Sequence, residues 1–200
     1  MTEQNLDKYQ HILVVDLEAT CCDSQSIPRH QMETIEIGAV MVDTASLKIV
    51  DEFQTFIKPL RHPMLTEFCN QLTSITQSQV NTAPTFPEAI ELWQPWLSQF
   101  DKTIFGSWGD YDRKQLQQDG KHHRIDLPDP VSSNHVNLKE LFSITQGFNK
   151  RYGMAQALNL ADITLTGTHH RGIDDARNIS KLLPYILGRQ KIIKIDRPSI

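Results

Sequence analysis

Residues 11–21 read HILVVDLEATC and place two acidic side chains at the end of a run of aliphatic residues. The run from His11 to Asp16 is short and rich in β-branched residues, which is typical of a strand buried on both faces of a sheet. Side chains two positions apart in a strand point to the same side, so Asp16 and Glu18 are expected to converge. Neighbouring carboxylates repel each other unless a cation joins them. The pair is therefore a candidate metal site at a strand end.

The segments that surround this strand predict the rest of the fold. Four strands are expected, at residues 11–16, 33–42, 47–57 and 102–106. Capping signals and helical periodicity predict four helices, at residues 85–100, 111–118, 138–151 and 173–186. Three strands in succession, followed by alternating helices and strands, indicate a mixed α/β sheet with helices on its faces.

Length and composition restrict the class of protein. The chain has 200 residues, 39% hydrophobic and 22% charged, which suits one folded domain over 1–200 and excludes a disordered, collagen-like or coiled-coil protein. A soluble, cytoplasmic protein is expected, because no apolar run is long enough for a membrane span or a leader. The three cysteines lack the spacing of a zinc knuckle and the even number of a disulfide framework. The formal charge of −4 argues against nucleic-acid binding by basicity alone, but bound cations would still allow a polyanionic substrate.

Two more segments carry titratable side chains next to a predicted helix. The segment 106–112, GSWGDYD, follows the fourth strand, so it can lie beside the end of the first strand, where ligands gather in α/β sheets. Asp110 and Asp112 are both candidates, and either could instead cap the helix. The segment 169–175, HHRGIDD, is a glycine-containing loop that runs into the last helix, so an imidazole and a carboxylate can approach one site. The alternative is a surface histidine and an N-cap aspartate.

Taken in order, these motifs resemble the DEDDh family of 3′-to-5′ exonucleases. The set is DLEATC at 16–21, SWGDYD at 107–112, and His170 with Asp175. The first motif is similar to the branch that contains the enhancer-of-RNA-interference exonucleases and bacterial KapD. With further similarity in ETIEIGA, FIKP and FCNQLTSI, the resemblance covers about residues 10–187, before a basic C-terminal tail at 189–200 that is expected to be loosely packed. It implies a ribonuclease H-like fold, a mixed five-stranded sheet flanked by helices, with the fifth strand near 135–138 or Leu165.

The resemblance also implies roles for individual residues. The metal-binding carboxylates would be Asp16, Glu18, Asp112 and Asp175. His170 would be the general base, on a loop that Gly167 and Gly172 allow to move over bound substrate. Asp112 is preferred to Asp110 because it follows an aromatic residue, and His170 is preferred to His169 because of its spacing to Asp175. An all-carboxylate site suits two magnesium or manganese ions, since hard cations prefer oxygen ligands.

Substrate contacts are expected around this site. Leu17, Ala19 and Thr20 would follow the terminal nucleotide, as the corresponding segment does in the family. Phe68, Leu72 and Trp108 are candidates for stacking on terminal bases, with core packing as the alternative. The basic residues Lys58, Arg61, Lys121, Arg124 and Arg171 could meet backbone phosphates, although scattered charge is usually solvated surface.

The implied activity is that of a metal-dependent 3′-to-5′ exonuclease. It would hydrolyse phosphodiester bonds at single-stranded 3′ ends and release nucleoside 5′-monophosphates, with RNA favoured over DNA. A DNA-trimming or proofreading exonuclease with the same site is a second hypothesis. A non-catalytic regulatory protein of the same fold that binds nucleic acid is a third.

Overall fold

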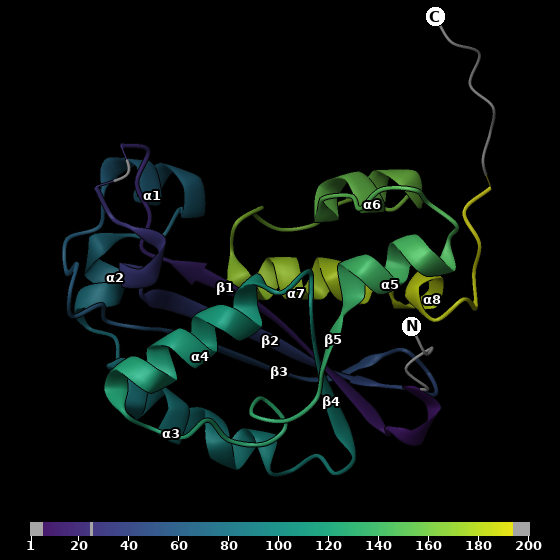
Figure 1. Cartoon of the computed structure of the whole chain (residues 1–200), viewed down its shortest axis with the longest axis horizontal. Coiled ribbons are helices and arrows are strands. Elements are labelled where there is room, and N and C mark those ends of the chain that lie inside the picture. The colour runs from purple at the N-terminus through teal and green to yellow at the C-terminus, as the bar shows by residue number, and fades with distance from the viewer. Residues whose placement is uncertain (1–5, 25, 194–200) are drawn as a thin grey trace, which may run out of the picture.

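The computed structural model describes residues 6–24 and 26–193, and at its centre is a five-stranded sheet in the order β3-β2-β1-β4-β5. The strands are β1 (His11–Ala19), β2 (Thr34–Asp43), β3 (Ile49–Phe56), β4 (Thr103–Ser107) and β5 (His135–Asn137). Strands β1 to β3 form an antiparallel meander, and β4 and β5 run parallel to β1 (Figure 1). The predicted mixed five-stranded sheet is confirmed, and its fifth strand lies at 135–137 rather than at Leu165.

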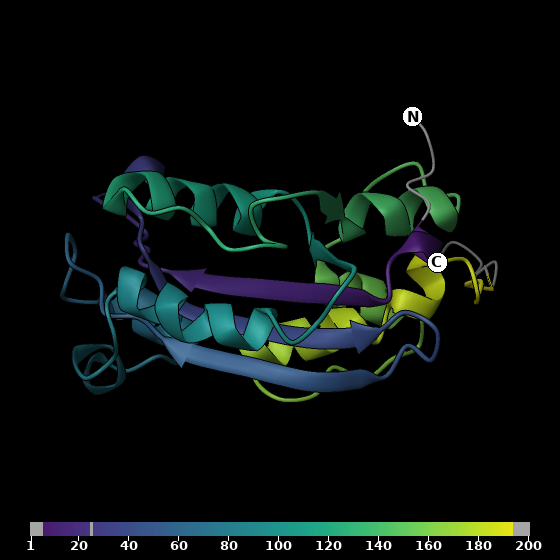
Figure 2. The same cartoon turned by 90° about the horizontal axis from the view of Figure 1, so that it is seen from below.

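Helices cover both faces of this sheet. They are α1 (Glu67–Thr73), α2 (Gln77–Asn81), α3 (Phe86–Leu97), α4 (Tyr111–His123), α5 (Leu138–Thr145), α6 (Met154–Leu160), α7 (Gly172–Ser180) and α8 (Leu183–Ile186), with short 3-10 turns η1 (Leu6–Lys8) and η2 (Arg29–Gln31). In Figure 2, α3 lies in front of β1 and β2 while α7 lies behind them. Within the described residues, no helix is both long and apolar enough to cross a membrane.

Strand β1 runs through the middle of the core because both of its faces are apolar. Leu13, Val15 and Leu17 pack into the cluster that contains α3, whereas Ile12 and Val14 pack into the cluster that contains α7. This alternation carries on into Asp16 and Glu18, which therefore project toward the α7 face. The buried strand predicted at 11–16 is confirmed and extends to Ala19.

Several predicted helices have different bounds in the structure. The helix expected at 138–151 ends at Thr145, because Gly147 adopts a left-handed conformation with φ 67° and turns the chain. The helix expected at 173–186 is divided into α7 and α8, since Pro184 lacks the N–H that a continuous helix needs. Helices α1, α2 and α6 were not predicted.

The start of the C-terminal segment is anchored rather than loosely packed. The guanidinium of Arg189 donates hydrogen bonds to the backbone oxygens of Ala45 and Thr44, each 2.7 Å long. Lys191 donates to the backbone oxygen of Thr145. The remainder of the predicted basic tail, 194–200, lies outside the described residues.

Candidate active site

Three carboxylates meet on the α7 face of the sheet. Asp16 and Glu18 come from the end of β1, and Asp175 comes from the first turn of α7. One oxygen from each lies within 4.8 Å of the others, which is close enough for one metal ion to bind all three. Asp16 and Glu18 converge as the strand periodicity predicts, although Asp175 is far away in the sequence.

Asp175 reaches these residues because two glycines let α7 approach the sheet closely. A β-carbon on Gly38 of β2 would lie 2.0 Å from the backbone of Gly172, and one on Gly172 would lie 2.8 Å from the Asp16 backbone oxygen. No side chain fits into this contact. The pair Gly38 and Gly172 therefore sets the distance between Asp175 and the carboxylates of β1.

Asp112 comes from the start of α4 and binds the edge of β1. Pairing between β1 and β4 ends at Val14 and Gly106, so the N–H of Leu17 has no partner in β4. That N–H donates to Oδ1 of Asp112 at 3.1 Å. The alternative residue, Asp110, is the N-cap of α4 and lies near Arg113 and His135 at 3.7 and 3.9 Å. Asp112 lines the cavity at this site and Asp110 does not.

The pKa values of all four carboxyl groups are shifted upward, and in Asp16 and Glu18 repulsion from the other carboxylates adds to burial. Burial is the main cause in each case, and it raises the pKa of Glu18 to about 8 and those of Asp112 and Asp175 to about 6. The pKa of Asp16 is also well above its usual range, because of burial and then the neighbouring Asp112, Glu18 and Asp175. These upward shifts indicate that the negative charges of the four carboxylates are not balanced by positive charge at the site.

The residues fit a divalent cation. Oδ1 of Asp175 is buried and has no hydrogen-bond partner in the part of the chain that the structure describes. A buried oxygen of this kind is costly unless something binds it. The donors are carboxylate oxygens, which are the ligands of hard cations. A divalent metal ion would satisfy both the free oxygen and the accumulated negative charge.

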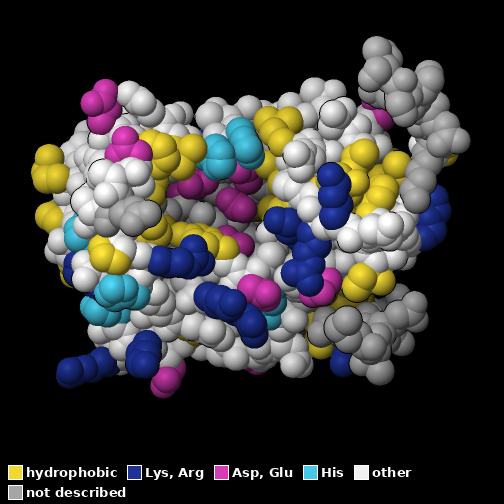
Figure 3. Space-filling view, turned by 45° about the horizontal axis from the view of Figure 1, so that its top comes forward, with side chains coloured by type: hydrophobic (Ala, Val, Ile, Leu, Met, Phe, Trp, Pro, Cys, Tyr) yellow, Lys and Arg dark blue, Asp and Glu magenta, His cyan; other side chains and the backbone are white. Residues whose placement is uncertain are grey.

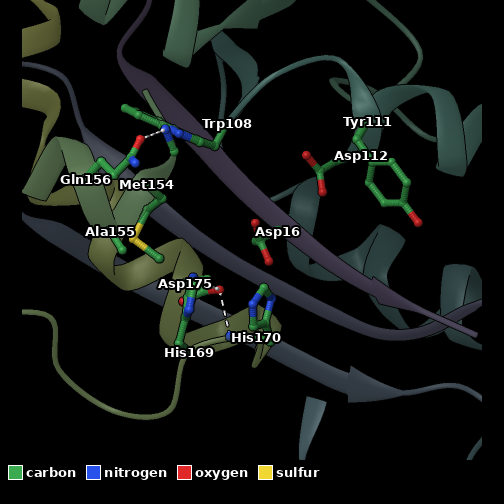
Figure 4. Close-up of a pocket in the computed structure, with 11 residues that line it drawn as sticks. Asp16, Trp108, Tyr111, Asp112, Met154, Ala155, Gln156, His169, His170 and Asp175 are labelled. Carbon is green, nitrogen blue, oxygen red and sulfur yellow. Dashed lines mark hydrogen bonds and ion pairs between the residues drawn. The ribbon is translucent and has the colours of Figure 1, made fainter. Parts of the chain in front are cut away.

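Two histidines border the same carboxylates. The backbone N–H of His170 donates to Oδ2 of Asp175 at 3.0 Å, and His170 has a left-handed φ of 62°. Nε2 of His169 lies 3.9 Å from the same oxygen, and the two rings are 4.0 Å apart. In Figure 4 the His170 ring points toward Asp16, while His169 lies against Asp175. Burial lowers the pKa of His170, which favours the neutral imidazole.

The loop that carries these histidines has no hinge at Gly172. Its N–H donates to Oε2 of Glu36 at 3.1 Å, and it begins α7 in tight contact with β2. Gly167, with φ 77°, is the glycine in the loop that adopts a conformation few other residues accept. The prediction that both glycines give the loop freedom is therefore wrong for Gly172.

Arg171 is held by Glu36, a residue that the sequence analysis did not single out. The Glu36 side chain is completely buried on β2, and Nε and Nη2 of Arg171 donate to its carboxylate at 3.0 and 3.2 Å. Gln54 adds a third side-chain donor at 2.6 Å. Arg171 thus forms an ion pair within the protein, and a contact from it to a phosphate stays a prediction.

A cavity of about 370 Å³ opens in front of the carboxylates and histidines. In Figure 3 it is a hollow with acidic side chains inside, histidines above it, and Lys and Arg side chains along the lower rim. Its far wall consists of Trp108 and the start of α6, Gly153 to Gln156. The indole N–H of Trp108 donates to the backbone oxygen of Tyr152 at 3.1 Å, which joins Trp108 to this wall. Nothing in the residue types of 153–156 pointed to this role.

The other predicted substrate-binding residues lie outside the cavity lining. Leu17, Ala19 and Thr20 are buried, and the Thr20 hydroxyl accepts the N–H of Glu33. Any contact from these three to a nucleotide would use the backbone. Phe68 and Leu72 are 38% and 36% exposed on α1, so the alternative of core packing does not apply to them.

Known proteins with similar sequences are nucleases. Residues 13–183 match a family model described as Exonuclease. A mouse protein named ERI1 exoribonuclease 3 is 30% identical over 94% of this chain and 56% of its own length. The human 3′-5′ exoribonuclease 1 is 28% identical over 87% of this chain and 51% of its own length. The chain thus spans about half the length of these curated relatives.

Solved structures give the same result. The nuclease domain of 3′hExo, a DEDDh family member bound to rAMP, is 27% identical with a TM-score of 0.80, and the match covers 94% of this chain and 97% of that domain. A 3′-exonuclease solved in 3′-end specific recognition of a histone mRNA stem-loop has a TM-score of 0.83 at 26% identity, over 90% of this chain and 64% of that one. Exonuclease I, at 9% identity and a TM-score of 0.68, shares the fold.

Proposed function

This chain belongs to the exonuclease family whose model spans residues 13–183, and on that premise we propose that it removes nucleotides one at a time from single-stranded 3′ ends. The products would be nucleoside 5′-monophosphates, and RNA would be preferred to DNA. Residues 10–187 would act as a single exonuclease domain, because one sheet and its covering helices carry the whole site.

The observation that carries this proposal is the meeting of four carboxylates, three of them buried, from three separate elements. Asp16 from β1, Asp112 from α4 and Asp175 from α7 line a cavity together with the His170 imidazole, and a carboxylate oxygen of Glu18 from β1 lies within 4.8 Å of those of Asp16 and Asp175. Stability alone does not account for the cluster, because burial raises the pKa of all four carboxyl groups, so their charged forms are unfavourable in the folded protein. Binding of cations and a phosphodiester accounts for it.

The carboxylates divide between two ions in this proposal. Asp16, Glu18 and Asp175 would hold one Mg²⁺ or Mn²⁺, and Asp16 with Asp112 a second. When bound, the ions supply positive charge to the phosphoryl oxygens and to the attacking and leaving groups. The backbone N–H of Leu17 keeps Asp112 oriented toward the cavity through its 3.1 Å hydrogen bond.

His170 would take the proton from the attacking water. Its lowered pKa keeps it neutral near pH 7, so it can accept a proton there. The hydrogen bond from its backbone N–H to Asp175 fixes the backbone of His170 beside the metal-binding residues. The rings of Trp108 and Tyr111 line the same cavity and offer surfaces for bases, and Phe68 and Leu72 would contact the strand from α1.

The preference for RNA is supported by the relatives, which are named exoribonucleases. A direct test incubates matched 3′-tailed RNA and DNA oligonucleotides with the protein in Mg²⁺ and in EDTA. We expect the RNA to shorten from its 3′ end faster than the DNA, and neither to shorten in EDTA. Shortening of DNA alone would assign a DNA-trimming enzyme, and no shortening of either would contradict the proposal.

Two substitutions test the roles within the site. Asp16→Asn removes a ligand shared by both ions, and we expect a loss of at least about 10²-fold in kcat, as for the loss of a main electrostatic group. His170→Ala should cost about 10²–10⁴-fold, the range for a general base. His169→Ala is the matched control and should retain most of the activity. Full turnover by His170→Ala together with inactive Asp16→Asn would overturn the role of His170.

A further inference from the structure

An arginine that contacts the cavity-lining residue Tyr111 has no role in the site described so far. Arg29 belongs to η2, in the connection between β1 and β2, and its guanidinium carbon lies 4.2 Å from the centre of the Tyr111 ring. Tyr111 lines the cavity and directly precedes Asp112. The Arg29 charge opposes the upward pKa shifts of Tyr111 and Asp112, so its field reaches into the site.

Apart from its stacking on Tyr111, the guanidinium of Arg29 has no polar partner among the described residues. Four arginines have acidic partners: Arg171 pairs with Glu36, Arg177 with Glu52, Arg151 with Glu140 and Arg113 with Asp110. Among the described residues, the Arg29 side chain makes no hydrogen bond or ion pair, and the four carboxylates nearby are not within ion-pair distance of it. Arg29 is exposed, so its donors are available to a ligand.

The backbone that carries Arg29 is held in place by α4. Nε2 of Gln118 donates to the backbone oxygen of Arg29 at 3.3 Å and to that of Met32 at 2.9 Å. Nε2 of Gln115 donates to the same Met32 oxygen at 2.9 Å. The helix that presents Tyr111 and Asp112 therefore also fixes the turn that presents Arg29. A side chain positioned in this way loses less entropy when it binds a ligand.

We propose that Arg29, stacked on Tyr111, binds a backbone phosphate of the nucleic-acid strand that enters the cavity. The ligand class follows from the chemistry, because a planar guanidinium with free donors matches the oxygens of a phosphodiester. A strand approaching four carboxylates is repelled until cations balance their charge, and Arg29 supplies positive charge beside Tyr111, next to Asp112. The inference rests on the proposed function, since it assumes a nucleic-acid strand as the ligand.

Binding in a catalytically silenced background tests this contact apart from turnover. The protein carries Asp175→Asn, and binding of a fluorescent eight-nucleotide RNA in Mg²⁺ is followed by anisotropy at several salt concentrations. Arg29→Gln is expected to weaken binding roughly tenfold, as for one charged hydrogen bond. It should also reduce the slope of log K against log salt by about 0.7, the value for one phosphate contact to a single strand. Arg29→Lys should retain the slope, because the charge remains.

The control is Lys48→Gln, an exposed lysine on the turn between β2 and β3, beside the His11 end of β1 and so about 16 Å along that strand from Asp16, where no effect on the slope is expected. Because a phosphate contact does not read the base, the loss should be equal for oligo(A), oligo(U) and oligo(C). Unchanged affinity and slope in Arg29→Gln, or no binding by the silenced protein, would overturn the proposal. Arg29-dependent binding by a protein whose wild-type form shortens no RNA would instead refute the proposed exonuclease function and leave this inference standing.

Discussion

At the scale of single residues, the position of His170 depends on a buried ion pair beside it. Glu36 is completely buried and accepts hydrogen bonds from Arg171, Gly172 and Gln54. Removing one member of a buried pair leaves the other charge without compensation, which costs about 3–5 kcal/mol. Glu36 thus fixes Arg171, the residue that follows His170, because its carboxylate accepts hydrogen bonds from the Arg171 side chain and from the backbone N–H of Gly172.

We therefore expect Glu36→Gln to lower the free energy of unfolding by about 3 kcal/mol. It should also reduce kcat more than it raises KM, because the loop that carries His170 loses its anchor. Denaturant unfolding and steady-state kinetics measure the two effects. The matched control is Glu52→Gln, whose partner Arg177 is 41% exposed, so that the loss should stay within about 1 kcal/mol. Equal effects of the two substitutions would contradict the argument.

The residue scale also shows what sequence reasoning could reach. Asp16 and Glu18 were identifiable as a candidate pair because they stand at the end of a predicted strand, where residue type and position both point to a site. The residues alone left Asp110 and Asp112 as alternatives, and the family resemblance decided between them. Glu36 was not identifiable, because its partner Arg171 is 135 positions away and an acidic residue within a strand gives no signal by itself. Arg29 was missed for the same reason, since only the fold brings it onto Tyr111.

At the scale of elements, the contact between α7 and the sheet determines whether the metal-binding residues meet. Gly38→Ala would place a β-carbon 2.0 Å from the backbone of Gly172, so α7 has to move away from β2. We expect a loss of stability at or above the roughly 1–3 kcal/mol that is typical of overpacking. Asp175 would move with the helix, so the affinity for Mn²⁺, measured by calorimetry, should fall as well.

Gly153→Ala is the control for this prediction. A β-carbon there would have Oε1 of Gln156 as its nearest neighbour at 3.8 Å, which is ordinary contact. Its cost should remain below about 1 kcal/mol, the difference between glycine and alanine at a helix N-cap. If Gly38→Ala left Mn²⁺ affinity unchanged, the close approach of α7 would not be what assembles the site.

The elements themselves were predictable where their patterns were strong. The four strands and α3 have clear periodicity or capping signals, and the structure contains all of them. Helix α6 was not predictable because its seven residues are joined to α5 by a turn that the sequence analysis included in one helix. As a result one wall of the cavity, Gly153 to Gln156, was missing from the predicted site.

At the scale of the whole molecule, the carboxylate cluster connects stability to pH and to metal. Burial raises the pKa of Glu18 to about 8 and those of Asp112 and Asp175 to about 6, whereas unfolded chains have values near 4. Between these values the folded state binds more protons than the unfolded state, so the free energy of unfolding falls as pH rises. The metal-free protein should therefore lose stability progressively from about pH 4 to about pH 8 through these groups.

A divalent cation should reverse this trend, because it binds the deprotonated carboxylates of the folded state. In thermal unfolding at pH 5, 6, 7 and 8, we expect Mg²⁺ to raise Tm relative to EDTA by an amount that grows with pH. A Mg²⁺ concentration of a hundred times Kd corresponds to a gain of about 2.7 kcal/mol in the free energy of unfolding.

Glu18→Gln removes the group with a pKa of about 8, so in EDTA this variant should lose less stability than the wild type between pH 6 and 8. Asp51→Gln, on exposed β3, is the control and should follow the wild-type curve. A wild-type Tm in EDTA that rises from pH 6 to 8, or a Mg²⁺ effect of equal size at pH 5 and pH 8, would mean that these carboxylates are not what couples folding to the metal.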